Sequence, residues 1–197
     1  MCSLMRTDSK ARQGCRALQV CALRTDIASK PFTIHYSPFT IHCFKIMIYL
    51  ATKTDRSLLN TLFSEFYASD AVLHPIPQRY HDAALDELFS GASRQRAYLL
   101  ADGETPVGYA LLSEKFSHEA GGPELWLEEL YLREAARGKG LGGEFFRFLL
   151  ASAQKEGIAR VRLEVEPENI RAAALYARLG FQPLPYDQMA WTPEEPK

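Results

Sequence analysis

The chain has 197 residues, of which 47% are hydrophobic and 24% are charged, and its formal net charge is −1. This length allows one domain with a sizeable core, and no apolar run approaches the roughly 18 residues that a membrane-spanning helix requires. The charge is uneven, with a balance of +5 in residues 1–46 and −6 in the remainder. An acidic body favours a cationic partner over a nucleic acid, although a solvated acidic surface explains the same charge.

The first 46 residues differ in character from the rest of the chain. They hold all four cysteines (Cys2, Cys15, Cys21 and Cys43), and Pro-Phe-Thr-Ile-His occurs at both 31–35 and 38–42. The spacing of cysteine and histidine matches no zinc pattern, so no metal site is expected. We interpret residues 1–46 as an N-terminal extension that is poorly ordered or non-native, with Met47 as the natural start. A transit peptide is the alternative for this basic segment.

From Met47 onward, strand and helix patterns alternate along the chain. A strand at 48–52 precedes a helix marked by Leu58, Leu62 and Phe66, which repeat at helical spacing. The expected elements that follow are a loop at 70–80, a helix at 82–89, a hairpin of strands at 96–101 and 107–114, a strand at 124–132, a helix at 140–156, a strand at 160–165, a helix at 170–179 and short final strands. This order predicts a mixed α/β (α+β) class that begins with an antiparallel sheet.

A glycine-rich loop joins the strand at 124–132 to the long helix. Residues 137–143 read Arg-Gly-Lys-Gly-Leu-Gly-Gly. Glycines let backbone N–H groups approach an anion without a Cβ in the way, and the N-terminus of the following helix attracts negative charge. Arg137 and Lys139 add positive charge. The loop therefore predicts a binding site for a phosphate or a pyrophosphate.

The same loop fits the dinucleotide pattern Gly-x-Gly-x-x-Gly through Gly138, Gly140 and Gly143. That pattern follows a buried apolar strand in a doubly wound sheet. Here the preceding strand carries Glu128 and Glu129, and the loop leaves too little chain for such a sheet. We therefore reject the dinucleotide interpretation.

Three motifs in order resemble the signatures of the GNAT superfamily of N-acetyltransferases, over about residues 47–191. Residues 137–142 are similar to its Arg/Gln-x-x-Gly-x-Gly/Ala loop and residues 127–134 to its central strand. Residues 169–181, which read Asn-x-x-Ala-x-x-Leu-Tyr-x-x-Leu-Gly-Phe, are similar to its second signature. The resemblance implies the GNAT fold for residues 47–197, a twisted mixed β-sheet with splayed central strands flanked by helices.

The resemblance also implies acetyl-CoA as the co-substrate. The loop amides would bind its pyrophosphate, the backbone of the central strand would pair with its pantetheine arm, and an asparagine would contact the coenzyme nearby. The residues implied in coenzyme binding are Leu130, Tyr131, Leu132, Arg137, Gly138, Lys139, Gly140, Leu141, Gly142, Gly143 and Asn169. The side chains of Leu130 and Leu132 can pack in the core at the same time, because the coenzyme contact uses their backbone.

Acetyl transfer to nitrogen requires a neutral amine, yet a primary alkylamine with a pKa of about 10.4 is almost entirely protonated at pH 7. Glu128 matches the position where polyamine acetyltransferases place a carboxylate, which makes it the candidate base. A carboxylate that only binds the cationic substrate is the alternative. Strand alternation predicts that Glu128 and Glu129 lie on opposite faces of the sheet. Tyr176 matches the family tyrosine that protonates the departing thiolate.

The acceptor pocket is expected between the first two helices, their loop and the final strands. Candidate acceptor contacts in these segments are His74, Tyr80, His81, Tyr186 and Trp191. A histidine in a proline-rich loop is more often structural or solvated than a substrate contact.

These implications together predict an enzyme that transfers acetyl from acetyl-CoA to a primary amine by direct attack. The acceptor is expected to be a small polyamine-like or amino-acid-like molecule, and no metal, nucleic-acid or membrane partner is expected. A homodimer and a cytoplasmic location are expected from the resemblance. Two alternatives stay open: a protein N-terminal or lysine acetyltransferase, which needs an open peptide groove, and a non-catalytic acetyl-CoA-binding regulator, which needs neither Glu128 nor Tyr176.

Overall fold

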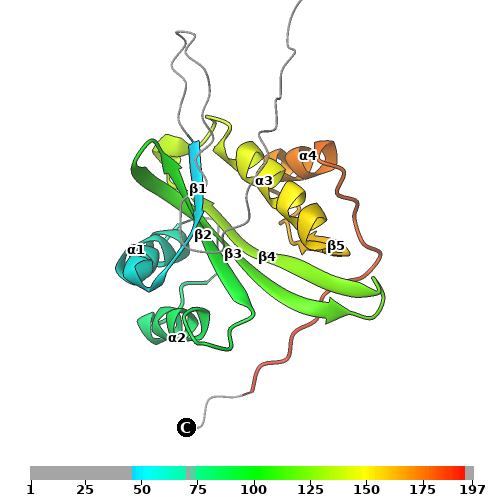
Figure 1. Ribbon diagram of the computed structural model, residues 1–197, viewed down its shortest axis with the longest axis horizontal. Coiled ribbons are helices and arrows are strands. Elements are labelled where there is room, and N and C mark those ends of the chain that lie inside the picture. Colours follow the sequence, from blue (N-terminus) through cyan, green and yellow to red (C-terminus); the bar gives the residue numbers. More distant parts are fainter. Residues whose placement is uncertain (1–45, 70–71, 73, 194–197) are drawn as a thin grey trace, which may run out of the picture. The chain divides into compact units, whose positions relative to one another are not determined.

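The computed structural model describes residues 46–69, 72 and 74–193, and the interpretations placed on residues 1–45 lie outside them. The described residues form a sheet with helices on both of its faces (Figure 1). In chain order the elements are β1 (Ile46–Leu50), η1 (Lys53–Asp55), α1 (Arg56–Tyr67), α2 (Gln78–Leu88), β2 (Gln95–Asp102), β3 (Thr105–Ser117), β4 (Gly122–Leu132), η2 (Glu134–Ala136), α3 (Leu141–Glu156), β5 (Arg160–Leu163) and α4 (Ile170–Arg178).

The sheet has five strands in the order β1-β2-β3-β4-β5. Neighbouring strands from β1 to β4 run antiparallel, and β5 runs parallel to β4. The parallel step requires a crossover, which α3 supplies between β4 and β5. The predicted mixed α/β class and the mixed sheet flanked by helices are confirmed.

Each face of the sheet packs against its own pair of helices (Figure 1). On the face that we call the α1/α2 face, buried residues of these two helices pack against alternate residues of the sheet, including Leu99 and Tyr109. On the opposite face, which we call the α3/α4 face, Leu100 and Leu112 pack against Phe145 of α3. Burial of a Leu or Phe side chain stabilises the fold by about 1.5–3 kcal/mol, so the two clusters hold β2–β4 from both sides.

Two parts of the chain differ from the sequence-based prediction. The second helix begins at Gln78 rather than at residue 82, because Pro77 at the N-cap supplies an extended entry with φ −62° and ψ 146°. The predicted final strands are wrong for the described residues, since 182–193 contain no strand. Pro183 and Pro185 lack the N–H donor that a strand ladder needs, and the segment leaves Trp191 85% exposed.

Candidate functional site

β4 and the edge strand β5 separate halfway along β4. Residues Glu124–Leu127 of β4 pair with Arg160–Leu163 of β5, but β4 continues to Leu132 and pairs there only with β3. The outer edge of β4 from Glu128 to Leu132 therefore has no strand partner within the described part of the chain. Its N–H and C=O groups can pair with an extended ligand.

β4 contains a β-bulge where the strands separate. Leu112 of β3 pairs with Leu127, whereas the adjacent Leu111 pairs with Glu129. Glu128 is thus an extra residue with no partner on β3. A bulge of this kind interrupts the strict alternation of side chains along a strand.

The bulge places two neighbouring carboxylates on the α1/α2 face. Ser113 Oγ donates a hydrogen bond to Glu128, and the hydroxyl of Tyr109 donates one to Glu129. Because Tyr109 and Ser113 are four residues apart in β3, their side chains lie on the same face of the sheet. The prediction that Glu128 and Glu129 lie on opposite faces is wrong, since it assumed a regular ladder.

Glu129 is the more enclosed of the two carboxylates. Its second hydrogen bond comes from the Tyr67 hydroxyl at the end of α1, at 2.7 Å. Burial raises the pKa of Glu129, the neighbouring Glu128 charge raises it too, and the two tyrosine hydrogen bonds oppose the rise. Burial also raises the pKa of both tyrosine hydroxyls, so they remain donors at neutral pH.

Glu129, Tyr67 and Tyr109 were not predicted as site residues from the sequence. A signal was present, because the leucines of the strand occupy positions 125 and 127 and then 130 and 132. The change from odd to even positions is typical of an inserted residue between them. The two tyrosines carried no comparable signal, since they come from α1 and β3.

The glycine-rich loop lies between η2 and α3. Gly138 and Gly140 have φ values of 78° and 87°, a left-handed conformation that favours glycine. Gly140 is the N-cap of α3 and provides no side-chain cap. The first amides of the helix also have no partner within it, and this combination indicates an anion-binding site at the loop. The predicted location of this loop at a helix N-terminus is confirmed.

The predicted cations of the loop also make contacts within the protein. Arg137 Nε donates to the Leu132 carbonyl at 2.8 Å, and Lys139 Nζ lies 3.7 Å from Asp102 Oδ2. A further cation comes from α4, because a Cβ placed on Gly138 would lie 3.6 Å from Arg171 Nη2. Arg171 was absent from the sequence-based candidates, and its proximity to Gly138 brings the start of α4 beside the loop.

Helix α4 carries the other two predicted site residues. Asn169 is its N-cap, and its side-chain oxygen accepts from the Ala172 amide at 3.1 Å. The ring of Tyr176 packs against Phe146 and Phe181, with ring centroids 5.1 and 6.0 Å apart. Burial raises the pKa of the Tyr176 hydroxyl. The structure thus places Tyr176 on the α3/α4 face, whereas Glu128 lies on the α1/α2 face.

The predicted acceptor contacts divide into one buried residue and four exposed ones. His81 is 5% exposed and its ring lies 5.2 Å from that of Tyr67, next to Glu129. The side chains that remain exposed are His74, Tyr80, Tyr186 and Trp191. Only His81 is therefore brought towards the carboxylate pair.

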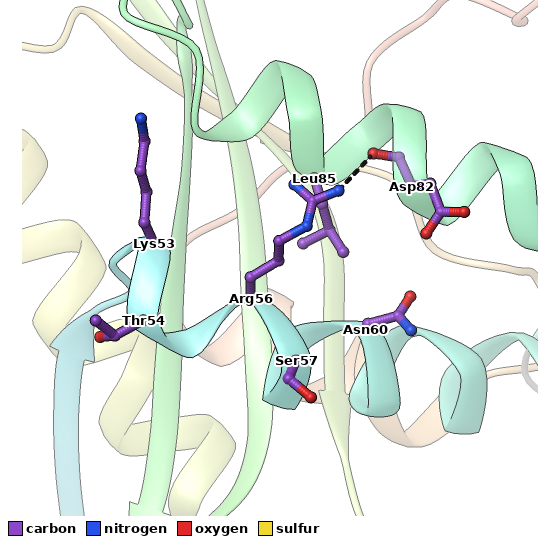
Figure 2. Close-up of a pocket in the computed structure, with 7 residues that line it drawn as sticks. All are labelled: Lys53, Thr54, Arg56, Ser57, Asn60, Asp82 and Leu85. Atoms are coloured by element: carbon purple, nitrogen blue, oxygen red, sulfur yellow. Dashed lines mark hydrogen bonds between the residues drawn. The ribbon is translucent and has the colours of Figure 1, made fainter.

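A groove among the described residues lies elsewhere, between the first turns of α1 and the middle of α2 (Figure 2). It has a volume of about 380 Å³ and is lined by Lys53, Thr54, Arg56, Ser57, Asn60, Asp82 and Leu85. Arg56 donates to the Asp82 carbonyl at 3.4 Å and pairs with Asp86 at 2.9 Å. The groove includes no residue of β4 or of the glycine-rich loop, and we do not assign the chemistry to it.

Two structural features are absent from the described residues. No group of His, Cys, Asp and Glu side chains among them is arranged to hold a metal ion. Among the same residues, no helix has the length and apolar character needed to cross a membrane.

An open strand edge beside a glycine-rich helix N-terminus is an arrangement that can bind an extended, phosphate-bearing ligand. Residues 57–181 match the model of the acetyltransferase (GNAT) family. The chain therefore belongs to that family, and the resemblance inferred from its motifs is confirmed.

Curated relatives include several amine acetyltransferases. The chain is 34% identical to the thialysine N-epsilon-acetyltransferase of Bos taurus and 32% identical to the spermine/spermidine N(1)-acetyltransferase of Bacillus subtilis. These alignments cover 42% and 39% of this chain and 48% and 52% of the relatives, so the chain spans about half of their length. The probable toxin TacT of Sinorhizobium fredii is 30% identical, over 60% of this chain and 87% of the toxin.

Solved structures support the same fold. A protein of Clostridium difficile 630, described as a possible acetyltransferase, superposes with a TM-score of 0.65 at 20% identity and covers 76% of this chain and 99% of its own. At this identity the likeness concerns the fold alone.

Proposed function

We propose that the protein transfers acetyl from acetyl-CoA to the primary amine of a small polyamine-like or amino-acid-like molecule, by direct attack of the amine on the thioester. The observation that carries this proposal is the separation of β4 from β5 after Leu127. It leaves the backbone of residues 128–132 open on the strand that leads into the glycine-rich loop. Membership of the acetyltransferase (GNAT) family supports the same activity.

The coenzyme would lie along this open edge. The amides of the loop from Arg137 to Gly143 would hold the pyrophosphate, because they combine left-handed glycines with a helix N-terminus. The backbone of β4 from Leu130 through Tyr131 to Leu132 would pair with the pantetheine arm. Asn169 and Arg171, at the start of α4, would add polar contacts beside the loop.

The carboxylate pair would bind and deprotonate the amine. An ammonium group is stabilised by two nearby negative charges, and Glu128 is exposed, so it can receive the proton and release it to solvent. Glu129 would hold the ammonium. Because the pKa of Glu129 is raised, the carboxylate pair would have a pKa closer to neutral pH, which suits a base. The attack breaks the thioester bond and forms an amide, and the electron pair passes to the thiolate of CoA.

Tyr176 would supply the proton that the thiolate needs. A phenol whose pKa is raised by burial stays protonated at neutral pH and can donate a hydrogen bond to the developing thiolate. This role requires the hydroxyl to reach the sulfur through the gap between β4 and β5. A homodimer and a cytoplasmic location form part of the same proposal.

The test is release of free CoA thiol from acetyl-CoA by the full chain, with polyamines, diamines, amino acids, aminoglycosides and short peptides as acceptors. We expect turnover with small amines and a fall in kcat of about 100-fold for Glu128→Gln, as for loss of a general base. Glu87→Gln, an exposed change on α2, is the control. Turnover with peptides alone would favour a protein acetyltransferase, and acetyl-CoA binding without turnover on any acceptor would favour a regulator.

A further inference from the structure

The backbone of Leu132 faces the open edge of β4. The N–H of the next residue, Arg133, donates to the Val107 carbonyl of β3 at 2.8 Å. Successive residues of an antiparallel strand direct their N–H and C=O groups to opposite edges, so those of Leu132 and Leu130 face the edge that β5 leaves open. Leu132 therefore carries the last acceptor of the open edge, at the end of β4.

The side chain of Arg137 occupies that acceptor. Its Nε donates to the Leu132 carbonyl oxygen at 2.8 Å, which is within the usual range of an N–H···O bond. Its guanidinium carbon lies 6.0 Å from the centre of the Tyr131 ring, so the end of the side chain extends over the preceding residue of β4. Arg137 thus takes the position at Leu132 where an amide N–H of an extended ligand would pair.

Arg137 differs from the other cations near the glycine-rich loop in what it joins. Lys139 Nζ lies 3.7 Å from Asp102 Oδ2 of β2, and Arg171 of α4 lies beside Gly138. The backbone of Arg137 belongs to the loop, whereas its side chain reaches the open edge of β4. A movement of this one side chain can therefore link the two parts of the proposed coenzyme site.

A phosphate is a stronger partner for a guanidinium group than a backbone carbonyl is. The bond to Leu132 joins a charged donor to a neutral acceptor, whereas both partners are charged in a guanidinium–phosphate pair, which can also be bidentate. Arg137 is exposed, so its side chain is free to rotate towards solvent. An anion held by the loop amides would therefore attract the guanidinium group away from the carbonyl.

We propose that Arg137 is a specificity residue that exchanges between two acceptors. It covers the Leu132 carbonyl until a phosphate group binds at the loop, and it then turns to the phosphate and uncovers the open edge. This inference rests on the proposed function and concerns how the coenzyme site recognises its ligand. A pantetheine arm without a phosphate must displace Arg137 and gains no new bond in return. The site would thus select phosphate-bearing CoA thioesters over smaller thioesters.

The test measures binding of pantetheine and phosphopantetheine to the full chain by isothermal titration. The two ligands share the same arm and differ by one phosphate group. Arg137→Met removes the donor and the charge. We expect this change to lower the Kd for pantetheine by about three- to tenfold, because the Leu132 carbonyl becomes accessible.

For phosphopantetheine, the same change should act in the opposite direction. We expect Arg137→Met to raise the Kd for this ligand by about threefold or more, because the lost bond to phosphate outweighs the gain at Leu132. A purely structural role of Arg137 would move the two dissociation constants in the same direction.

Further variants separate the charge from the contact. Arg137→Lys places a methylene group where arginine has Nε, so it should tighten pantetheine binding and weaken phosphopantetheine binding less than Arg137→Met does. Arg171→Met removes the cation beside Gly138 and should weaken phosphopantetheine binding without tightening that of pantetheine. Arg178→Met, an exposed change at the end of α4, is the control and should alter neither. Thermal unfolding of each variant checks that the fold is preserved.

The outcomes separate this inference from the proposed function. Pantetheine binding to Arg137→Met that is no tighter than to the wild type, including no detectable binding to either, would overturn the inference. An unchanged or lower Kd for phosphopantetheine in this variant would overturn it too. Neither result bears on acetyl transfer, which the thiol-release assay measures. Failure of both phosphopantetheine and CoA to bind the wild-type chain would overturn the inference together with the proposed coenzyme site.

Discussion

Glu128 and Glu129 are adjacent in β4, yet their carboxylates accept hydrogen bonds from Ser113 and Tyr109, which share one face of the sheet. This arrangement exists because Glu128 is the extra residue of a β-bulge. Two like charges held so close raise the free energy of the doubly ionised state. A bound ammonium lowers that free energy, and the pair is therefore suited to a cationic substrate.

The first prediction concerns the acidic limb of the pH profile. Burial raises the pKa of Glu129 above the ordinary 4.5, so its ionised form develops at a higher pH than that of an ordinary glutamate. We expect kcat/KM to rise with pH through this pKa, and Glu129→Gln to remove that limb. Tyr109→Phe removes a donor that lowers the pKa of Glu129, so the limb should move to higher pH. A profile unchanged in both variants would contradict the assignment.

The second prediction concerns the proton donor. Tyr176→Phe removes the hydroxyl and keeps the ring that packs against Phe146 and Phe181. We expect kcat to fall by about 10–100-fold, with little change in KM for acetyl-CoA and little change in melting temperature. Phe148→Leu, which alters a partly buried ring on α3, is a control for packing. An unchanged kcat in Tyr176→Phe would remove the proposed role.

The third prediction concerns the glycine-rich loop. Gly140 has a φ of 87°, and an alanine there costs about 1–2 kcal/mol in this left-handed conformation. We expect Gly140→Ala to raise the KM for acetyl-CoA, because the strain is relieved only if the first amides of α3 turn away from the anion. Gly91→Ala is the matched control, since its φ is not positive and a Cβ there meets no atom within 4 Å. Isothermal titration of both variants with CoA measures the corresponding change in Kd.

The fourth prediction concerns stability and pH. Arg133 donates two hydrogen bonds to Glu65, at 2.7 and 2.8 Å, and ties the end of β4 to α1. These bonds lower the pKa of Glu65 below 4.5, so their contribution is complete above the unfolded pKa and is lost as pH falls through the folded one. Both side chains are about one third exposed, which limits the contribution to about 1 kcal/mol.

Urea unfolding at pH 7 and near pH 3 tests this ion pair. Glu65→Gln should lower the free energy of unfolding by about 1 kcal/mol at pH 7. It should lower it by less at the lower pH, which lies below the unfolded pKa, so that part of the contribution of the wild-type pair is already lost there. An equal loss at the two pH values would mean that the pair contributes through packing rather than charge.

Much of the candidate site could be predicted from local sequence. The glycine-rich loop, the strand before it and the helix after it were predicted because glycine spacing and hydrophobic period are properties of one segment. The bulge at Glu128 was missed because it is defined by pairing between two strands. Its only sign in the sequence is that the leucines of the strand change from odd to even positions. Tyr67 and Arg171 were missed because the fold, rather than their neighbours in sequence, brings them to the site.

The prediction of short final strands in the C-terminal segment was wrong for a different reason. Short apolar stretches around Leu184 and Met189 resemble strands by composition, but Pro183 and Pro185 remove donors that a sheet requires. The same reasoning explains why the acceptor contacts placed at Tyr186 and Trp191 stay exposed in the structure.

Because of its bulge, β4 can lose one residue at Glu128 and keep its pairing with β3. Deletion of Glu128 would join Leu127, opposite Leu112, directly to Glu129, opposite Leu111, and regular alternation would resume. Every other side chain of β4 would keep its present face. Loss of a single codon could therefore remove one carboxylate while preserving the sheet, so that gain and loss of this acidic pair are one insertion or deletion apart.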